Sequence, residues 1–339
     1  MTILIDIIQL VWRVLRFLVV WLVLLLAVMW AFGALWFDFP INHLAHGVAF
    51  AFIVAVLAAL LFVRPTWRSK LGVVIAVVMV AAWWLTIKPT EDRNWQPDVA
   101  RTGWAEVDGD TVTLHEVRNC DYRTETDFTP RWETRTVQLS KIEGVDVAVN
   151  YWGSPWIAHP IVSFRFSDAP PITFSIEARK VVGQNYSTLA SLYRQAQLIY
   201  IPADERDTIR LRAVFRGEDV YLYRTLVPPE GARERFLEYI RSLNDLHARP
   251  RWYNVLTTNC TTTIRQQHPE AERLPWDWRI LLNGKGDEMM YDRHMVATGG
   301  LSFPELKSRS WINYLAVPAS NDPDFWKRIR EGVPGFVNQ

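Results

Sequence analysis

Long apolar runs dominate the N-terminal part of the chain. Residues 17–37 contain no charged residue, and two shorter apolar runs follow at residues 47–63 and 71–87. A helix needs roughly 17–25 such residues to cross the hydrocarbon core of a bilayer. The first run is longer than the roughly 7–15 apolar residues of a secretory signal, and a signal would not explain the other two. The pattern therefore predicts a membrane anchor over residues 1–87 with three transmembrane helices.

The basic residues around these runs predict their orientation. Arg13 and Arg16 precede the first run, residues 38–46 contain no Lys or Arg, and residues 64–70 carry three. Because loops rich in Lys and Arg stay in the cytoplasm, the N-terminus is expected inside the cell and everything after residue 87 outside. We therefore expect a multi-pass protein of the bacterial inner membrane with a periplasmic C-terminal domain.

The pattern changes after the anchor. Residues 88–105 are polar and predict a tether, whereas residues 106–339 contain short alternating runs that are typical of strands. Strands are expected at residues 111–117, 136–142, 146–152, 160–166, 172–178, 209–215 and 220–223, and helices at residues 187–197 and 228–247. Strands and helices in separate runs favour an α+β domain with a central antiparallel sheet over a doubly wound parallel sheet.

Charge and composition exclude some classes of function. The chain carries 37 Lys and Arg against 36 Asp and Glu, and it has no block rich in basic residues. A nearly neutral domain of this kind does not fit nucleic-acid binding. No spacing of His, Cys, Asp and Glu resembles a set of metal ligands, so neither a metal nor another cofactor is expected.

Cys260 is the clearest candidate for chemistry. An apolar stretch ends in the polar residues 257–259, and Cys260 falls where the next helix should begin. The free N–H groups of a helix N-terminus favour a thiolate and can hold an oxyanion. A lone cysteine near a helix start is more often an inert buried residue, so that alternative stays open. Tyr253 is expected to line the site, and Asn259 either lines it or caps the helix.

A nucleophilic thiol also needs a base, and the chain has seven histidines. His159 is favoured because it opens the predicted strand at residues 160–166, and a strand histidine facing a helix-start cysteine is the geometry of thiol hydrolases. His268 lies roughly two turns beyond Cys260, too far along the helix axis to reach the thiol. From the residues alone, pairing His159 with Cys260 is one choice among several.

Three stretches resemble the Lnb N-terminal periplasmic domain family. Residues 152–179 contain His159, the run Val162-Ser163-Phe164 and the run Ser175-Ile176-Glu177-Ala178-Arg179. A second stretch runs from Tyr253 through Asn259-Cys260-Thr261-Thr262. The segment Asp277-Trp278-Arg279…Asn283-Gly284 resembles membrane-anchored Gram-negative members.

This resemblance covers about residues 90–335 and implies a permuted papain-like fold of the NlpC type, in which the histidine strand precedes the cysteine helix. The namesakes of the family are lipoprotein intramolecular acyltransferases, which move an acyl chain to the N-terminal amine of a lipoprotein. Their membrane helices follow the domain, whereas the anchor expected here precedes it. The resemblance therefore implies thiol-acyl chemistry more firmly than lipoprotein acylation.

A third group that orients the imidazole is expected from the neighbouring strand. If the two strands form a hairpin with Phe166 opposite Ile172, Arg179 lies directly opposite His159, and Glu177 lies one pair away on the same sheet face. Glu177 then either orients the imidazole or pairs with Arg179 to support the sheet. Arg179 is also expected at the substrate.

Several functions follow from this interpretation. In the favoured one, Cys260 attacks a carbonyl to form a thioester, His159 takes the thiol proton, and an amine or water accepts the acyl group. Membrane lipids are the expected partners, with lipoproteins and cell-envelope peptides as further candidates. The alternatives are an envelope cysteine peptidase or amidase and a non-catalytic binding or assembly module. A disulfide between Cys120 and Cys260 would remove the nucleophile.

Overall fold

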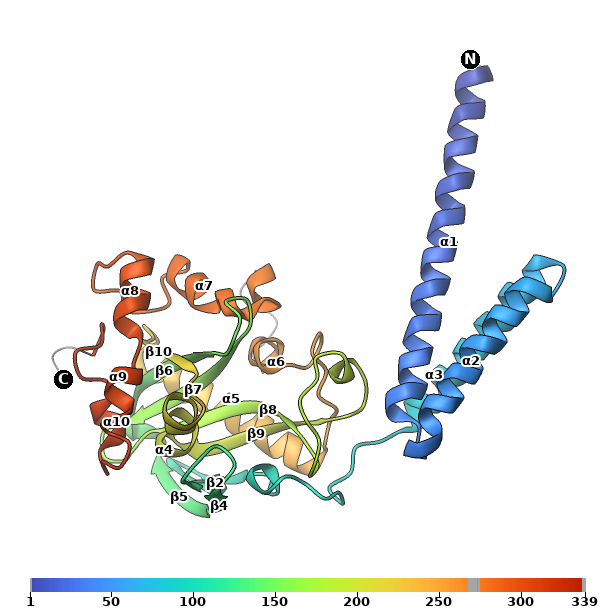
Figure 1. Ribbon diagram of the computed structural model, residues 1–339. Helices are drawn as coiled ribbons and strands as arrows, with labels where there is room; N and C mark the ends of the chain where they lie inside the picture. Colours follow the sequence, from blue (N-terminus) through green and yellow to red (C-terminus); the bar gives the residue numbers. More distant parts are fainter. Residues whose placement is uncertain (1, 268–272, 274, 337–339) are drawn as a thin grey trace. The chain divides into compact units, whose positions relative to one another are not determined.

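The computed structural model describes residues 2–267, 273 and 275–336, and the chain forms two compact units. The first unit is Met1–Pro89 together with Ser187–Gln195, and the second is Thr90–Tyr186 together with Ala196–Gln339 (Figure 1). His268 lies outside the described residues. The chain therefore returns to the anchor unit once, at Ser187, before it completes the second unit.

The first unit contains the three predicted apolar helices, α1 (Thr2–Asp38), α2 (Asn42–Phe62) and α3 (Thr66–Thr86). Each is long and apolar enough to cross a membrane. Apolar side chains pack where the helices meet, including Leu24, Val28, Val56 and Val73. The three apolar helices are thus confirmed. α1 begins well before residue 17, because the preceding residues stay mostly apolar.

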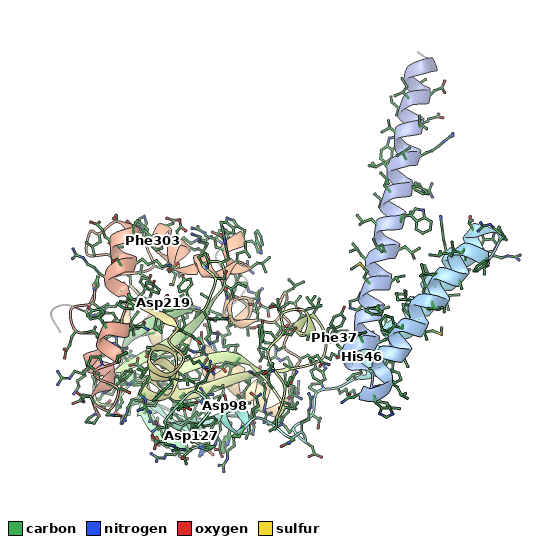
Figure 2. All side chains as sticks on the ribbon, viewed as in Figure 1. Phe37, His46, Asp98, Asp127, Asp219 and Phe303 are labelled. Carbon is green, nitrogen blue, oxygen red and sulfur yellow. The ribbon has the colours of Figure 1, made fainter. Side chains whose placement is uncertain are left out.

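The segment Ser187–Gln195 packs on the end of α1 and does not form the helix predicted over residues 187–197. Only a short turn, η3 (Ala190–Leu192), is helical. The ring of Tyr193 stacks on Phe37, which Figure 2 labels at this end of α1. The side chain of Gln195 donates to the Asp38 carboxylate at 2.7 Å. Tyr193, one of the apolar residues that suggested a helix, is used in the stacking contact with the anchor.

The second unit is built around one sheet with strand order β1-β2-β9-β8-β7-β6-β10, and β5 pairs with β2. The strands are β1 (Trp104–Asp108), β2 (Thr111–Arg118), β5 (Trp132–Gln138), β6 (Ile142–Tyr151), β7 (Ala158–Phe166), β8 (Ile172–Arg179), β9 (Gln197–Asp204) and β10 (Asp219–Arg224), and a separate pair is β3 (Asp121–Tyr122) and β4 (Phe128–Thr129). β2 and β9 pair in parallel, and the other neighbours pair antiparallel. The predicted mixture of helices with a mostly antiparallel central sheet is confirmed.

Helices of the second unit cover both faces of this sheet. They are α4 (Glu205–Arg210), α5 (Pro229–Ala248), α6 (Cys260–Gln267), α7 (Gly286–Asp292), α8 (Phe303–Ser310), α9 (Asn313–Ala316) and α10 (Phe325–Arg328), with short turns at η1 (Pro97–Val99), η2 (Leu139–Lys141), η4 (Leu211–Phe215), η6 (Trp278–Ile280) and η7 (Asn283–Lys285). In Figure 1, α4 lies in front of the sheet and α5 behind it.

The packing of these helices defines two faces. On the α5 face, Phe236 packs edge-on against Phe164, and both belong to the largest core cluster. On the α4 face, Ile161 of β7 shares a second cluster with Ile209 of α4. Because successive residues of a strand point to opposite faces, these residues fix the face of every neighbouring side chain.

The strand predicted over residues 209–215 was wrong, because this segment continues α4 into the π-helical turn η4. The Asp204 carboxylate accepts a hydrogen bond from the Arg206 N–H and caps α4. This cap starts a helix at Glu205, and Ile209 and Ala213, four residues apart, then face the same cluster. The helix cap at Asp204 therefore determines the structure of this segment, despite the alternation of apolar and polar residues that suggested a strand.

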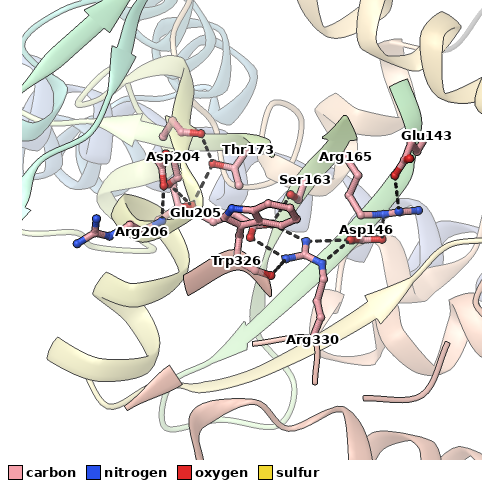
Figure 3. Close-up of polar contacts among 12 residues, drawn as sticks. Glu143, Asp146, Ser163, Arg165, Thr173, Asp204, Glu205, Arg206, Trp326 and Arg330 are labelled. Atoms are coloured by element: carbon pink, nitrogen blue, oxygen red, sulfur yellow. Dashed lines mark hydrogen bonds and ion pairs between the residues drawn. The ribbon is translucent and has the colours of Figure 1, made fainter. Parts of the chain in front are cut away.

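A buried ionic cluster on the α4 face joins the C-terminal segment to the sheet (Figure 3). The Arg330 guanidinium pairs with Asp146 of β6 at 2.8 Å and with Glu205 of α4 at 2.6 Å. Asp146 also accepts from Arg165, and Glu205 accepts from Ser163. Burial alone would lower the pKa of the Arg330 guanidinium, but the Glu205 and Asp146 carboxylates raise it overall.

Candidate active site around Cys260

Cys260 is the first residue of α6, the place that the sequence indicated. Asn259 precedes it, and its side-chain oxygen accepts a hydrogen bond from the Thr262 N–H at 2.8 Å. The Asn259 amide nitrogen donates to the Val255 carbonyl at 2.6 Å. Asn259 therefore caps the helix, which is one of the two roles that the sequence left open.

The sulfur of Cys260 is buried among hydrogen-bond donors. The residue is 7% exposed, and the Asn283 amide nitrogen donates to the sulfur at 3.5 Å. Burial raises the pKa of the Cys260 thiol, whereas the Thr261 hydroxyl and N–H, the Asn283 amide and the cysteine's own N–H lower it. Burial prevails, so the thiol is protonated at neutral pH and needs a base to react.

Tyr253 lies beside this sulfur, as the sequence suggested. It belongs to the same core cluster as Cys260, and its backbone N–H donates to the Ala196 carbonyl at 3.0 Å. Burial raises the pKa of the Tyr253 phenol, and the neighbouring Cys260 raises it further. The phenol is therefore neutral at physiological pH.

His159 lies on the α4 face of the sheet, whereas Cys260 packs on the α5 face. Two residues along β7, Ile161 belongs to the α4-face cluster, and strand alternation gives His159 the same direction. The His159 Nε2 atom lies 2.8 Å from the Ser175 hydroxyl. Among the described residues, the sulfur's hydrogen-bond partners are Thr261 and Asn283. The structure does not bring the predicted pair into contact.

The predicted register of β7 and β8 was wrong by two residues. Phe164, and not Phe166, lies opposite Ile172, and the ladder ends where Ile161 meets Ser175. Phe166 pairs with β6 instead. A shift by two residues preserves the faces, so Glu177 still lies on the His159 side of the sheet.

Glu177 reaches the imidazole only through Ser175. The Ser175 hydroxyl donates to the Glu177 carboxylate at 2.6 Å, and Arg212 pairs with the same carboxylate at 3.1 Å. Because the single hydroxyl proton is used in this bond, His159 must donate from Nε2, which leaves Nδ1 without a proton in the neutral ring. Burial would raise the pKa of Glu177, but Arg212 holds it well below its usual range.

Burial lowers the pKa of His159 to about 3, and the Arg212 charge acts in the same direction. In the folded protein the His159 imidazole therefore stays neutral as the pH falls, whereas in the unfolded chain it binds a proton near pH 6.5. Stability is unaffected above that value and falls as the pH drops from 6.5 toward 3. We expect His159 to cost about 2 kcal/mol of unfolding free energy between pH 7 and pH 5.

Thermal or denaturant unfolding of the full chain in detergent, at pH 7 and pH 5, measures this loss. His159→Gln should show a smaller acid loss than the wild type, because glutamine does not titrate. His247, which is exposed and bonds Thr102, provides the matched control as His247→Gln. An acid loss that is equal in wild type and His159→Gln would show that His159 accepts a proton in the folded state.

Arg179 holds the N-terminal segment of the domain. Its guanidinium donates to the carbonyls of Val99 and Ala100, pairs with Glu91 at 2.5 Å and stacks on the Trp95 ring. These contacts occupy the side chain, which is 2% exposed, so they do not support the expected role at the substrate. They also show that the segment predicted as a tether packs on the domain.

Asn283 and Gly284 were absent from the predicted site, although the sequence singled out this pair. The Asn283 side-chain oxygen accepts from the Ala158 N–H at 2.9 Å, while its nitrogen faces the Cys260 sulfur. The Gly284 N–H donates to the Trp156 carbonyl, and a Cβ on Gly284 would lie 2.3 Å from the Trp156 carbonyl carbon. Only glycine allows this approach, and it fixes Asn283 beside the sulfur.

The two cysteines do not form a disulfide. Both thiols are free and buried, and they belong to different core clusters. Burial, together with the Asp207 charge, raises the pKa of the Cys120 thiol to about 12. The Cys120 thiol therefore stays protonated at neutral pH, and Cys260 keeps a free sulfur.

Comparison with models of protein families gives a match over residues 128–284, to the family described as the Lnb N-terminal periplasmic domain. The matched segment contains β7, β8 and α6, and thus His159, Cys260 and Asn283. No curated protein and no solved structure matches the chain.

Proposed function

Because residues 128–284 belong to the Lnb N-terminal periplasmic domain family, we propose that the second unit is a periplasmic acyl-transfer domain with Cys260 as its nucleophile. The thiolate attacks an acyl carbonyl, expels the donor's leaving group and holds the acyl chain as a thioester. An amine or water then takes the acyl group and restores the thiol. The observation that carries this proposal is the free sulfur at the start of α6, among N–H donors.

His159 is the proposed base, acting after a local rearrangement. The β7–β8 ladder ends at Ile161, so His159 has no backbone partner on β8, while on its other side it pairs with Asn150 of β6. Its neighbour Ala158 is bonded to Asn283, which also bonds the sulfur, so two hydrogen bonds connect the two elements. A backbone rotation at the beginning of β7, with the pairing of His159 to β6 opened, would move the neutral imidazole from Ser175 toward Cys260. In this proposal the conformation seen here is a resting state, with Ser175 and Glu177 holding the base.

Exposed apolar side chains favour a lipid as the acyl donor. The segments that carry Ala158 and Asn283 also present large exposed residues, namely Trp156, Ile157, Trp276, Trp278, Leu281 and Leu282. Exposed apolar groups of this kind suit acyl chains and the bilayer interface, where tryptophan is enriched. The three apolar helices are proposed to hold the chain in the bacterial inner membrane with a cytoplasmic N-terminus. Membrane lipids would then supply the acyl group, and a lipoprotein amine would be one acceptor.

Labelling with a thiol-directed acyl probe tests the proposal on the full chain in detergent. Wild type and Cys120→Ala should form the labelled thioester, and Cys260→Ala should form none. His159→Ala should label at least about 10²-fold more slowly, the usual contribution of a general base. Equal labelling of wild type, Cys260→Ala and His159→Ala would remove the catalytic interpretation. A comparison of membrane lipids with and without the active protein would then identify the donor.

A non-catalytic envelope binding or assembly module is the second candidate. The observation that favours it is the separation of His159 and Cys260 on opposite faces of the sheet. On this alternative, the folded wild type stays unlabelled by the acyl probe, whereas Cys260 reacts with iodoacetamide once the chain is unfolded.

A further inference from the structure

Asn283 offers the sulfur of Cys260 a donor from outside α6. Its amide nitrogen lies 3.5 Å from the sulfur and 3.1 Å from the Thr261 hydroxyl. The orientation of the amide is fixed, because its oxygen accepts from the Ala158 backbone N–H. The side-chain N–H of Asn283 therefore faces the Cys260 sulfur as long as the turn η7 keeps its position.

Backbone N–H groups face the same sulfur. The N–H groups of Cys260 and Thr261 belong to the first turn of α6, where a helix leaves its N–H groups without internal partners. Both lower the pKa of the Cys260 thiol, as the Asn283 amide does. Three donors from two separate elements thus converge on one atom, at the positive end of a helix.

We propose that Asn283 is a catalytic residue that stabilises the oxyanion of the acyl-transfer reaction. When the Cys260 sulfur bonds to the acyl carbon, the carbonyl π electrons move to its oxygen, and the base takes the thiol proton. The negatively charged oxygen is bonded to the carbon that the sulfur attacks. It accepts hydrogen bonds from the Asn283 side-chain N–H and from the first N–H groups of α6. The oxyanion then re-forms the carbonyl and expels the leaving group, which takes the proton. This inference rests on the proposed function of Cys260.

Two measurements separate this role from a structural one. Hydrolysis of p-nitrophenyl octanoate passes through an oxyanion, whereas alkylation of the same thiol by iodoacetamide does not. Asn283→Asp keeps the oxygen that accepts from Ala158 but replaces the donor by a negative charge. We expect kcat for the ester to fall about 10²–10³-fold in Asn283→Asp and Asn283→Ala, with little change in KM. Iodoacetamide alkylation of Cys260 should stay within a few-fold of wild type in Asn283→Ala, whereas the new carboxylate of Asn283→Asp beside the sulfur should slow it.

The outcomes also separate this inference from the proposed function. If Cys260→Ala keeps the wild-type ester hydrolysis, the proposed nucleophile fails, whatever the Asn283 variants do. If Cys260→Ala is inactive and both Asn283 variants retain wild-type kcat, the oxyanion role of Asn283 is overturned. Equal losses in hydrolysis and in alkylation in Asn283→Ala would assign Asn283 to the placement of the thiol alone and would likewise overturn that role.

Discussion

Arg330→Ala should lower the free energy of unfolding by about 3–5 kcal/mol, the usual result of removing one partner from a buried ion pair. Arg330 is 7% exposed, and it contacts Asp146, which is fully buried, and Glu205. Without the guanidinium, the two carboxylates keep their burial and lose their shared cation (Figure 3). The loss is large because the charges that remain have no access to water.

Chemical unfolding of the full chain in detergent, followed by fluorescence, measures this loss at pH 7. Arg328→Ala is the matched control two residues away, because Arg328 pairs with Asp322 and Glu331 at the exposed surface. Its unfolding midpoint should stay near that of wild type. Arg330→Met combined with Asp146→Asn and Glu205→Gln should recover part of the stability. An Arg330→Ala midpoint equal to that of Arg328→Ala would mean that the cluster contributes nothing.

The three apolar helices and the clearest parts of the sheet could be predicted because few structures satisfy their patterns of apolar and polar residues. Three long runs without charge have no stable place outside a bilayer or a large core. β7 and β8 alternate and are separated by a turn rich in proline. β9 escaped prediction because it is buried on both sides, with Leu198 and Tyr200 on the α5 face and Ile199 and Ile201 on the other. A strand covered on both faces shows no alternation.

The site was predictable only where it depends on local chemistry. Polar cap residues before Cys260 indicated the helix start, and the structure has it there. The direction of His159 depends instead on the phase of β7, because a change of one residue moves every side chain to the other face. Asn283 meets Cys260 across a sequence separation of 23 residues, which no local pattern encodes. The only signal for it was the Asn283-Gly284 pair.

The contacts of Gly284 fix the position of the Asn283-Gly284 pair. The Gly284 carbonyl accepts from the Tyr151 hydroxyl at 2.9 Å, and Lys307 donates to that hydroxyl at 3.0 Å while pairing with Asp287. Backbone of the turn before β7 lies against the other side of Gly284. The turn that presents Asn283 is therefore held by β6, by the start of β7 and by α8, so a displacement of Gly284 moves the donor beside the sulfur.

Gly284→Ala should destabilise the domain by about 1–3 kcal/mol, as overpacking at a tight contact does. Its Cβ would meet the carbonyl carbon of Trp156 at 2.3 Å, the oxygen of Pro155 at 2.5 Å and the nitrogen of Ile157 at 2.6 Å. All three are backbone atoms, so the turn that carries Gly284 and the turn before β7 must move apart. A separation near 1 Å would also reduce ester hydrolysis about 10²-fold, because Asn283 leaves the sulfur.

Gly286→Ala is the matched control, because it lies two residues away with open space around its Cβ position and a helical backbone. Alanine there should stabilise the domain by about 0.4–1 kcal/mol, since it restricts the unfolded chain without meeting any atom. The two glycine variants should therefore shift the unfolding midpoint in opposite directions. If Gly284→Ala unfolds like Gly286→Ala and hydrolyses the ester at the wild-type rate, the turn at Gly284 does not position Asn283, and the sulfur's donor must be held in another way.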